Sequence, residues 1–191
     1  FVAQVGSWQS AAVGATFSRG DGLRTGPSAS AVVRVGKRGR ARVESSTTIR
    51  FLAQGDAQAA SGESGAAVAL DVERGQAVID VGDADLALQT RAGSAVLRRG
   101  ARVVLEKTGA EASATTRYRV LVGGATFLQA GGEKMELGAG QSVSIGIGLA
   151  VLDPIDALPS KTAINADRQA DANAARAAVV VHAGDAAVAA A

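Results

Sequence analysis

The chain has 191 residues, 47% hydrophobic but only 3% aromatic, with 24 glycines, three prolines and no cysteine. Its net charge of +2 is uneven: the first fifty residues carry eight cationic and two acidic side chains, which leaves −4 for the remainder. This composition excludes disulfides and cysteine chemistry, and a chain this long holds one substantial core or a domain of about 150 residues with an appendage.

The chain begins with two predicted short strands, over Val2–Val5 and Ala11–Phe17, separated by a turn at residues 6–9. Trp8, the only tryptophan, lies in that turn. We interpret it as capping one end of a barrel or sandwich, with ligand stacking as the less favoured alternative. The glycine-dense residues 18–27 then predict a turn, a short strand and a second turn.

A basic segment follows, with a predicted strand over Ala31–Val35 and a turn over residues 36–39. Beyond the turn, two arginines stand two residues apart, so a strand there projects both from one face. We expect a solvated face or a protein contact rather than a nucleic-acid site, because the segment lacks aromatic residues for base stacking. The candidate partner-contact residues are therefore Trp8, Arg34, Lys37, Arg38, Arg40 and Arg42.

The most regular pattern of the chain lies over Ala66–Val81, which predicts a β-hairpin at the centre of the fold. Apolar residues alternate on both sides of residues 73–76, where the sequence Glu-Arg-Gly-Gln predicts the turn. The preceding residues 53–65 have no periodicity and predict a mobile loop. Another strand is predicted over Thr48–Leu52.

Short alternating segments then recur at regular spacing through residues 86–147, separated by glycine turns. Together with the earlier segments they predict an all-β domain over residues 1–150, a multi-strand sandwich or meander of short antiparallel strands. No run approaches the roughly 18 apolar residues of a membrane span, so we expect no transmembrane segment in this chain.

Residues 151–191 are predicted as a linker, an alanine-rich helix and a C-terminal tail. The helix is expected from a cap at Ser160 to about Ala178. Its apolar face is little more than Ile164 and alanines, so we expect a linker or an arm that packs on a partner. The tail, with Val179–Val181, predicts either a closing hairpin or the start of a further module.

The order of these segments resembles the FecR domain of bacterial envelope proteins. Four stretches carry the resemblance: residues 20–31, with Gly-Asp and Thr-Gly; residues 68–77; residues 90–101; and residues 120–143, which end in a Leu-Gly-Ala-Gly-Gln turn. The resemblance covers roughly residues 2–147. Arg91 stands where the family usually has proline, and Ala101 where it usually has threonine.

The resemblance implies a location in the periplasm or at the outer envelope, and we expect that a leader has been removed. It favours a non-catalytic structural or protein-interaction subunit of a larger assembly, with other envelope proteins as partners. One alternative is a transporter-linked regulator of the anti-sigma-factor type. A second is a carbohydrate- or cation-binding envelope domain.

An enzyme is the least favoured class, and no cofactor is expected. The only histidine, His182, lies in the tail, so a histidine triad or multi-histidine metal site would depend on that one residue. Asp80 paired with Asp83 or Asp85 is a candidate glycosidase dyad or hard-cation site. We interpret these acids as solvated turn groups, because aspartate is a standard turn residue.

Overall fold

The structure is a computed structural model that describes residues 2–4, 7–18, 20–35, 39–52, 67–90, 93–109, 114–128, 134–146, 150–153, 159–176 and 179–181. The predicted loop over residues 53–65, the basic residues Lys37 and Arg38, and His182 lie outside these described ranges.

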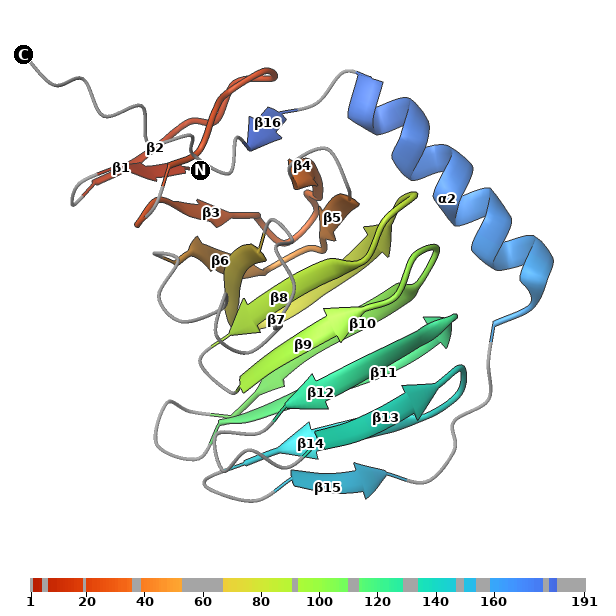
Figure 1. The fold of residues 1–191 in the computed structure, drawn as a ribbon. Coiled ribbons are helices and arrows are strands. Elements are labelled where there is room, and N and C mark those ends of the chain that lie inside the picture. Colours follow the sequence, from red (N-terminus) through yellow and green to blue (C-terminus); the bar gives the residue numbers. More distant parts are fainter. Residues whose placement is uncertain are drawn as a thin grey trace, which may run out of the picture.

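The described chain consists of short strands and a C-terminal helix, as the alternating pattern predicts (Figure 1). The helix is α2 (Lys161–Arg176). The strands are β1 (Val2–Gln4), β2 (Ser7–Gln9), β3 (Gly22–Arg24), β4 (Ala31–Val35), β5 (Gly39–Val43), β6 (Thr48–Phe51), β7 (Ala67–Val81), β8 (Leu86–Thr90), β9 (Gly93–Leu97), β10 (Arg102–Thr108), β11 (Thr115–Val122), β12 (Gly124–Leu128), β13 (Lys134–Gly138), β14 (Ser142–Ile145), β15 (Ala150–Asp153) and β16 (Val179–Val181).

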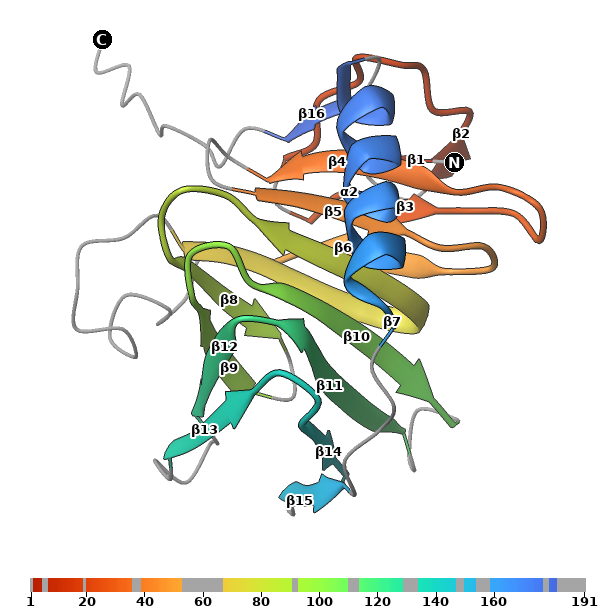
Figure 2. The same cartoon turned by 90° about the vertical axis from the view of Figure 1, so that its right-hand side faces the viewer.

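The strands form two layers that share β7 (Figures 1 and 2). The long sheet has the order β16-β4-β5-β7-β10-β11-β14-β15, and the short sheet has the order β7-β8-β9-β12-β13. Strands β2, β1, β3 and β6 extend the short sheet's layer from the first half of β7. All the pairings described are antiparallel except β7 with β8 and β16 with β4. The all-β sandwich followed by a helix is therefore confirmed.

The predicted hairpin over Ala66–Val81 is wrong, because residues Ala67–Val81 form one strand of 15 residues. Gly75 adopts a φ of 86°, and the pairing with β6 shifts register next to it. Leu70 and Val72 face the core before this bend, whereas Ala77 and Ile79 face it afterwards. The core-facing residues thus have even numbers before the bend and odd numbers after it. A β-bulge, which inserts one extra residue, produces this change without reversing the chain.

The bend lets β7 serve both layers. Its first half pairs with β6 and β8, and its second half lies between β5 and β10 in the long sheet. The segment is the centre of the fold, as the sequence suggests, but as a shared strand rather than a hairpin.

The start of the chain also differs from expectation. The predicted turn at residues 6–9 contains β2, which pairs with β1, while residues 11–17 form no strand. Phe17 is buried against Phe51, with ring centroids 5.0 Å apart, but Val13 is 76% exposed. Phe17 is thus the residue of this segment that joins the core, and the residues before it pair with no strand.

The core fills the space between the two layers with aliphatic side chains and a few aromatic rings. Tyr118 and Phe127 lie at its centre with ring centroids 4.8 Å apart. The buried Tyr118 hydroxyl forms a hydrogen bond with Thr90. Other core residues include Val33, Ala41, Ile49, Leu86, Leu88, Leu97, Leu105, Val120, Leu137 and Val143.

Two threonine hydroxyls tie the bend of β7 to the β3 segment. Thr25 accepts a hydrogen bond from the Thr47 amide at 3.0 Å and donates to the carbonyl of Glu44. Thr47, fully buried, in turn accepts from the Gln76 amide at 3.0 Å. The Thr-Gly motif over residues 25–26 is thus structural, because it satisfies backbone groups that would otherwise be buried without partners.

Candidate functional site

Helix α2 crosses the outer face of the long sheet (Figure 2). The Ser160 hydroxyl accepts a hydrogen bond from the Ala163 amide at 3.1 Å, so the predicted cap is confirmed. Ile164, Asp167, Arg168 and Asp171 follow at helical spacing and lie on one face of the helix. The contacts of this face are mainly ionic.

The side chains beneath the helix come from three adjacent strands. On β5, Ala41 and Val43 face the core, so Arg40 and Arg42 face outward. Asp80 on β7 pairs in register with Arg40 on one side and with Arg102 of β10 on the other. These strand residues and the charged helix residues form the α2 cluster, which comprises Arg40, Arg42, Asp80, Arg102, Asp167, Arg168 and Asp171.

Arg102 lies at the centre of the α2 cluster and is only 1% exposed. Its Nη1 contacts Oδ2 of Asp80 at 2.5 Å, and its Nη2 lies 3.0 Å from Oδ2 of Asp171. Both carboxylates are also buried. Removing such charges from water is costly and is offset only when the groups are paired with good geometry.

Two further arginines of the cluster bind the same two carboxylates. Arg168 donates from Nε to Asp80 at 2.9 Å and from Nη2 to the carbonyl of Gly100 at 2.7 Å. Arg42 donates to Asp171 at 3.1 Å and to Glu44 at 2.7 Å. Burial opposes the charge of Arg42, but the neighbouring carboxylates of Asp171 and Glu44 outweigh it and raise the pKa of this guanidinium.

The cluster explains how a helix with so thin an apolar face is held on its own sheet. Ile164 is buried, as expected for the one large apolar residue of α2, and ion pairs of the helix acids and of Arg168 add to the contact. The expected arm that packs on a partner is thus seen here against β4 and β5 of the same chain, with ion pairs that reach β7 and β10. After α2, β16 returns to pair in parallel with β4.

Of the three acids considered for catalysis or cation binding, Asp80 and Asp85 are engaged by different arginines, and Asp83 is exposed. Asp80 belongs to the α2 cluster, whereas Asp85 accepts from the Arg99 amide at 2.7 Å and from the Arg98 side chain at 3.2 Å. The Arg99 amide is the main cause of a lowered pKa of the Asp85 carboxyl. Among the described residues, no group of three or more acids and histidines is arranged to hold a metal.

The predicted partner-contact residues do not form one surface in the described chain. Arg40 and Arg42 lie beneath α2, and Arg34 is exposed on β4. The guanidinium of Arg24 lies over the ring of Trp8, 4.8 Å from its centroid. Lys37 and Arg38 are outside the described residues, so the predicted contact role of the set stays a prediction.

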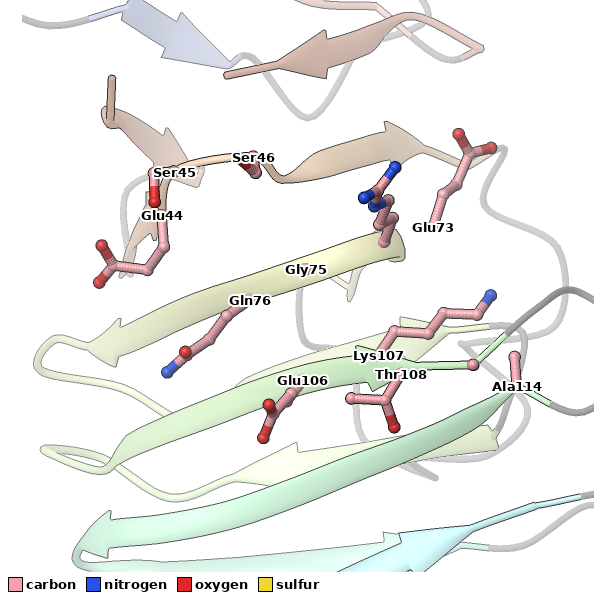
Figure 3. A pocket seen from close by; sticks show the side chains of 12 residues that line it. Glu44, Ser45, Ser46, Glu73, Gly75, Gln76, Glu106, Lys107, Thr108 and Ala114 are labelled. Carbon is pink, nitrogen blue, oxygen red and sulfur yellow. The ribbon is translucent and has the colours of Figure 1, made fainter. Parts of the chain in front are cut away.

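An open polar groove of about 770 Å³ lies at the bend of β7 (Figure 3). Gln76 and Glu106 project from paired positions of β7 and β10, and Lys107 and Thr108 continue the lining along β10. Two of its acids have arginine partners: Glu44 pairs with Arg42 at 2.7 Å, and Glu73 pairs with Arg50 at 2.6 Å. A cation entering this groove would therefore compete with internal guanidinium groups.

A second groove, of about 590 Å³, is more apolar and lies between residues 10–13, the β3–β4 region and the end of α2. Val13, Leu23, Val32 and Ala174 are among its lining residues. It borders the docked helix, so the position of α2 shapes this surface as well.

The sequence-based predictions missed the role of Arg102 and of the acids of α2. Two signals were available. Arg102 is a lone charge within the apolar run of residues 101–105, and Asp167 and Asp171 are spaced to lie on one side of a helix. The charge of Arg102 is opposite to that of the helix acids, but the sequence does not show that the fold places them side by side.

Among the described residues, no helix is both long and apolar enough to cross a membrane.

No protein-family model matches the chain, and no curated protein matches it in sequence. Its fold matches two crystal structures of a "putative anti-sigma factor" from Parabacteroides distasonis ATCC 8503, each with a TM-score of 0.53 and 11% sequence identity. Each match covers 71% of this chain and 60% of the solved chain. The chain thus matches less than two thirds of the length of its structural neighbours, and the likeness concerns the fold.

Proposed function

We propose that this chain is a non-catalytic, FecR-like module of the bacterial envelope that acts by contact with other proteins, in a regulatory role of the kind that anti-sigma factors have. The observation that carries the proposal is the fold it shares with the Parabacteroides protein, together with the four FecR-like stretches in the same order along the chain. The location would be the periplasm or the outer envelope.

The environment of the carboxylates supports a non-catalytic role. Asp80 and Asp85 are each held by arginines, and for Asp85 the Arg99 amide and the Arg98 side chain lower the pKa of the carboxyl. A glycosidase dyad requires one carboxyl to be protonated, which a nearby guanidinium opposes.

The regulatory role can be tested by deleting the gene in its host and measuring all transcripts. A regulator is expected to change a limited set of promoters that share one sigma factor, and the wild-type gene should restore them. Unchanged transcript levels in conditions that express the protein would contradict the regulatory role.

A second candidate is a structural subunit of a larger envelope assembly, and the edge strand β15 favours it. Val151 and Leu152 on this strand are 50% and 53% exposed, and in the described chain β15 pairs only with β14. Such an edge can accept a strand of another protein. Co-purification in a stable complex, with transcripts unchanged in the deletion strain, would favour this role over the regulatory one.

A further inference from the structure

The contact between α2 and the long sheet has the character of a binding interface. Asp167, Arg168 and Asp171 of the helix meet side chains of three strands, while most of the remaining helix side chains are exposed. Among the α2 residues whose burial is described, 161–174, only Ile164 and Asp171 are buried. Charge pairs of this kind give an interface its specificity and speed the association of a complementary partner.

The surface beneath the helix is basic, with an apolar patch beside it. Arg40, Arg42 and Arg102 face outward with one acid, Asp80. The neighbouring outward positions Val78, Val104 and Leu121 form a separate small apolar cluster, which is buried in the structure. A face of this kind suits a helix that presents acids together with apolar side chains.

Helix α2 does not satisfy this face completely. Nε of Arg102 is buried and has no hydrogen-bond partner in the structure, although both terminal nitrogens of the same guanidinium are paired. A buried donor without a hydrogen-bond partner lowers the stability of the contact. A helix that offered one more acceptor at this point would therefore bind the face better than α2 does.

We propose that the outer face of β5, β7 and β10 is a binding face for an acidic amphipathic helix of a partner protein, and that α2 occupies it as a displaceable internal ligand. The positive charge of the face favours an acidic helix, and the unpaired Nε of Arg102 favours a helix that brings a further hydrogen-bond acceptor. A second copy of α2 would leave that donor unmet again, so the partner helix differs from α2 in sequence. The inference rests on the proposed protein-contact role and names its surface.

The first test asks whether α2 leaves the sheet while the sandwich stays folded. Hydrogen exchange is measured on the full chain, on Asp171→Asn and on the matched control Asn173→Ala, whose residue is exposed on the same helix. In Asp171→Asn the amides of α2 should exchange at least about tenfold faster, while those of β7 and β10 keep their protection. If helix and strands lose protection together, or if α2 stays protected, the proposal is wrong.

The second test asks whether the vacated face selects an acidic helix. The probe is the sequence of α2, because α2 is the acidic helix that the structure shows on this face. Asp171→Asn is titrated with a fluorescent peptide of residues 159–176 carrying the native Asp167 and Asp171, and with a matched peptide that has asparagine at both positions. The acidic peptide should bind at least about tenfold more tightly, and addition of Arg42→Gln to the protein should remove the difference.

Three outcomes would overturn the proposal. These are equal binding of the two peptides, no binding at about 1 mM peptide although α2 has been shown to leave, and equally tight binding of polyglutamate or a single-stranded oligonucleotide. The last would indicate a general anion surface. All these measurements use purified protein, so their failure would leave the transcript test of the proposed function unaffected, and a negative transcript test would not explain a loss of peptide selectivity.

Discussion

The guanidinium of Arg102 on β10 lies 3.0 Å from the carboxylate of Asp171 on α2, and both side chains are buried. This pair joins a strand at the centre of the long sheet to the helix outside it. Its partners Asp80 and Arg42 extend the contact along two neighbouring strands.

Replacing Arg102 by methionine should destabilise the protein strongly. The change keeps much of the side-chain volume but leaves Asp80 and Asp171 without their shared cation, and loss of one member of a buried ion pair typically costs about 3–5 kcal/mol. Urea unfolding followed by circular dichroism gives the free energy of unfolding. Arg99→Met removes an exposed arginine from the adjacent turn and should change it by less than about 0.5 kcal/mol. Equal effects of the two variants would contradict the central role of Arg102.

Gly75→Ala should destabilise the bend of β7. The residue has a φ of 86°, and an added Cβ would clash with Oγ1 of Thr47. Thr47 is fully buried and cannot move without breaking its bond to the Gln76 amide, so a loss of at least about 2 kcal/mol is expected in thermal or urea unfolding. Gly20→Ala is the matched control, because its φ is 85° and no atom lies within 4 Å of the added Cβ. Gly20→Ala should lower the free energy of unfolding by about 1 kcal/mol, because only the strain of the left-handed backbone opposes the added Cβ.

Thr25→Val should reduce stability by about 1–3 kcal/mol. Valine has nearly the same shape but cannot accept the hydrogen bond of the Thr47 amide, which then stays buried without a partner. Thr126→Val provides the comparison on a strand, since that hydroxyl bonds Glu136 and Arg98 at the surface. A free energy of unfolding that falls no further for Thr25→Val than for Thr126→Val would refute the structural role of the Thr-Gly motif.

Tyr118 should stay protonated until the protein unfolds in alkali. Burial raises the pKa of its hydroxyl from the ordinary 10.0, against a smaller opposing effect of the Thr90 hydrogen bond. Because the folded pKa is the higher one, this contribution to stability is complete below pH 10 and is lost as the pH rises above it. The chain has a single tyrosine, so ultraviolet absorbance of tyrosinate reports this residue alone. The absorbance should rise together with the loss of circular dichroism, and a rise in the folded protein would show that the hydroxyl reaches solvent.

Local patterns predicted most of the strands and the start of the helix. Val33 and Val35, for example, alternate with an exposed arginine because β4 buries one face, and this period is visible in the sequence. Ser160 was also predictable as a cap, because its hydroxyl acts on the backbone of the next turn.

The bend of β7 was not predictable in this way. A glycine between two alternating segments fits both a turn and a bulge, and the choice depends on whether β5 and β6 are present to pair with the two halves. The docking of α2 has the same origin. The partners of its acids could not be predicted, because Arg42 and Arg102 are far away in the sequence.

The shared strand β7 also sets an order of assembly in time. β5, β6 and β10 all pair with it, and the first two come earlier in the chain. Pairing between such distant segments slows folding, because a long stretch of chain must be ordered before the contacts form. A ribosome or a translocation pore that delivers the chain from its N-terminus would hold β5 and β6 unpaired with β7 until Val81 has emerged, and during that interval their open edges are the part of the protein most exposed to wrong partners.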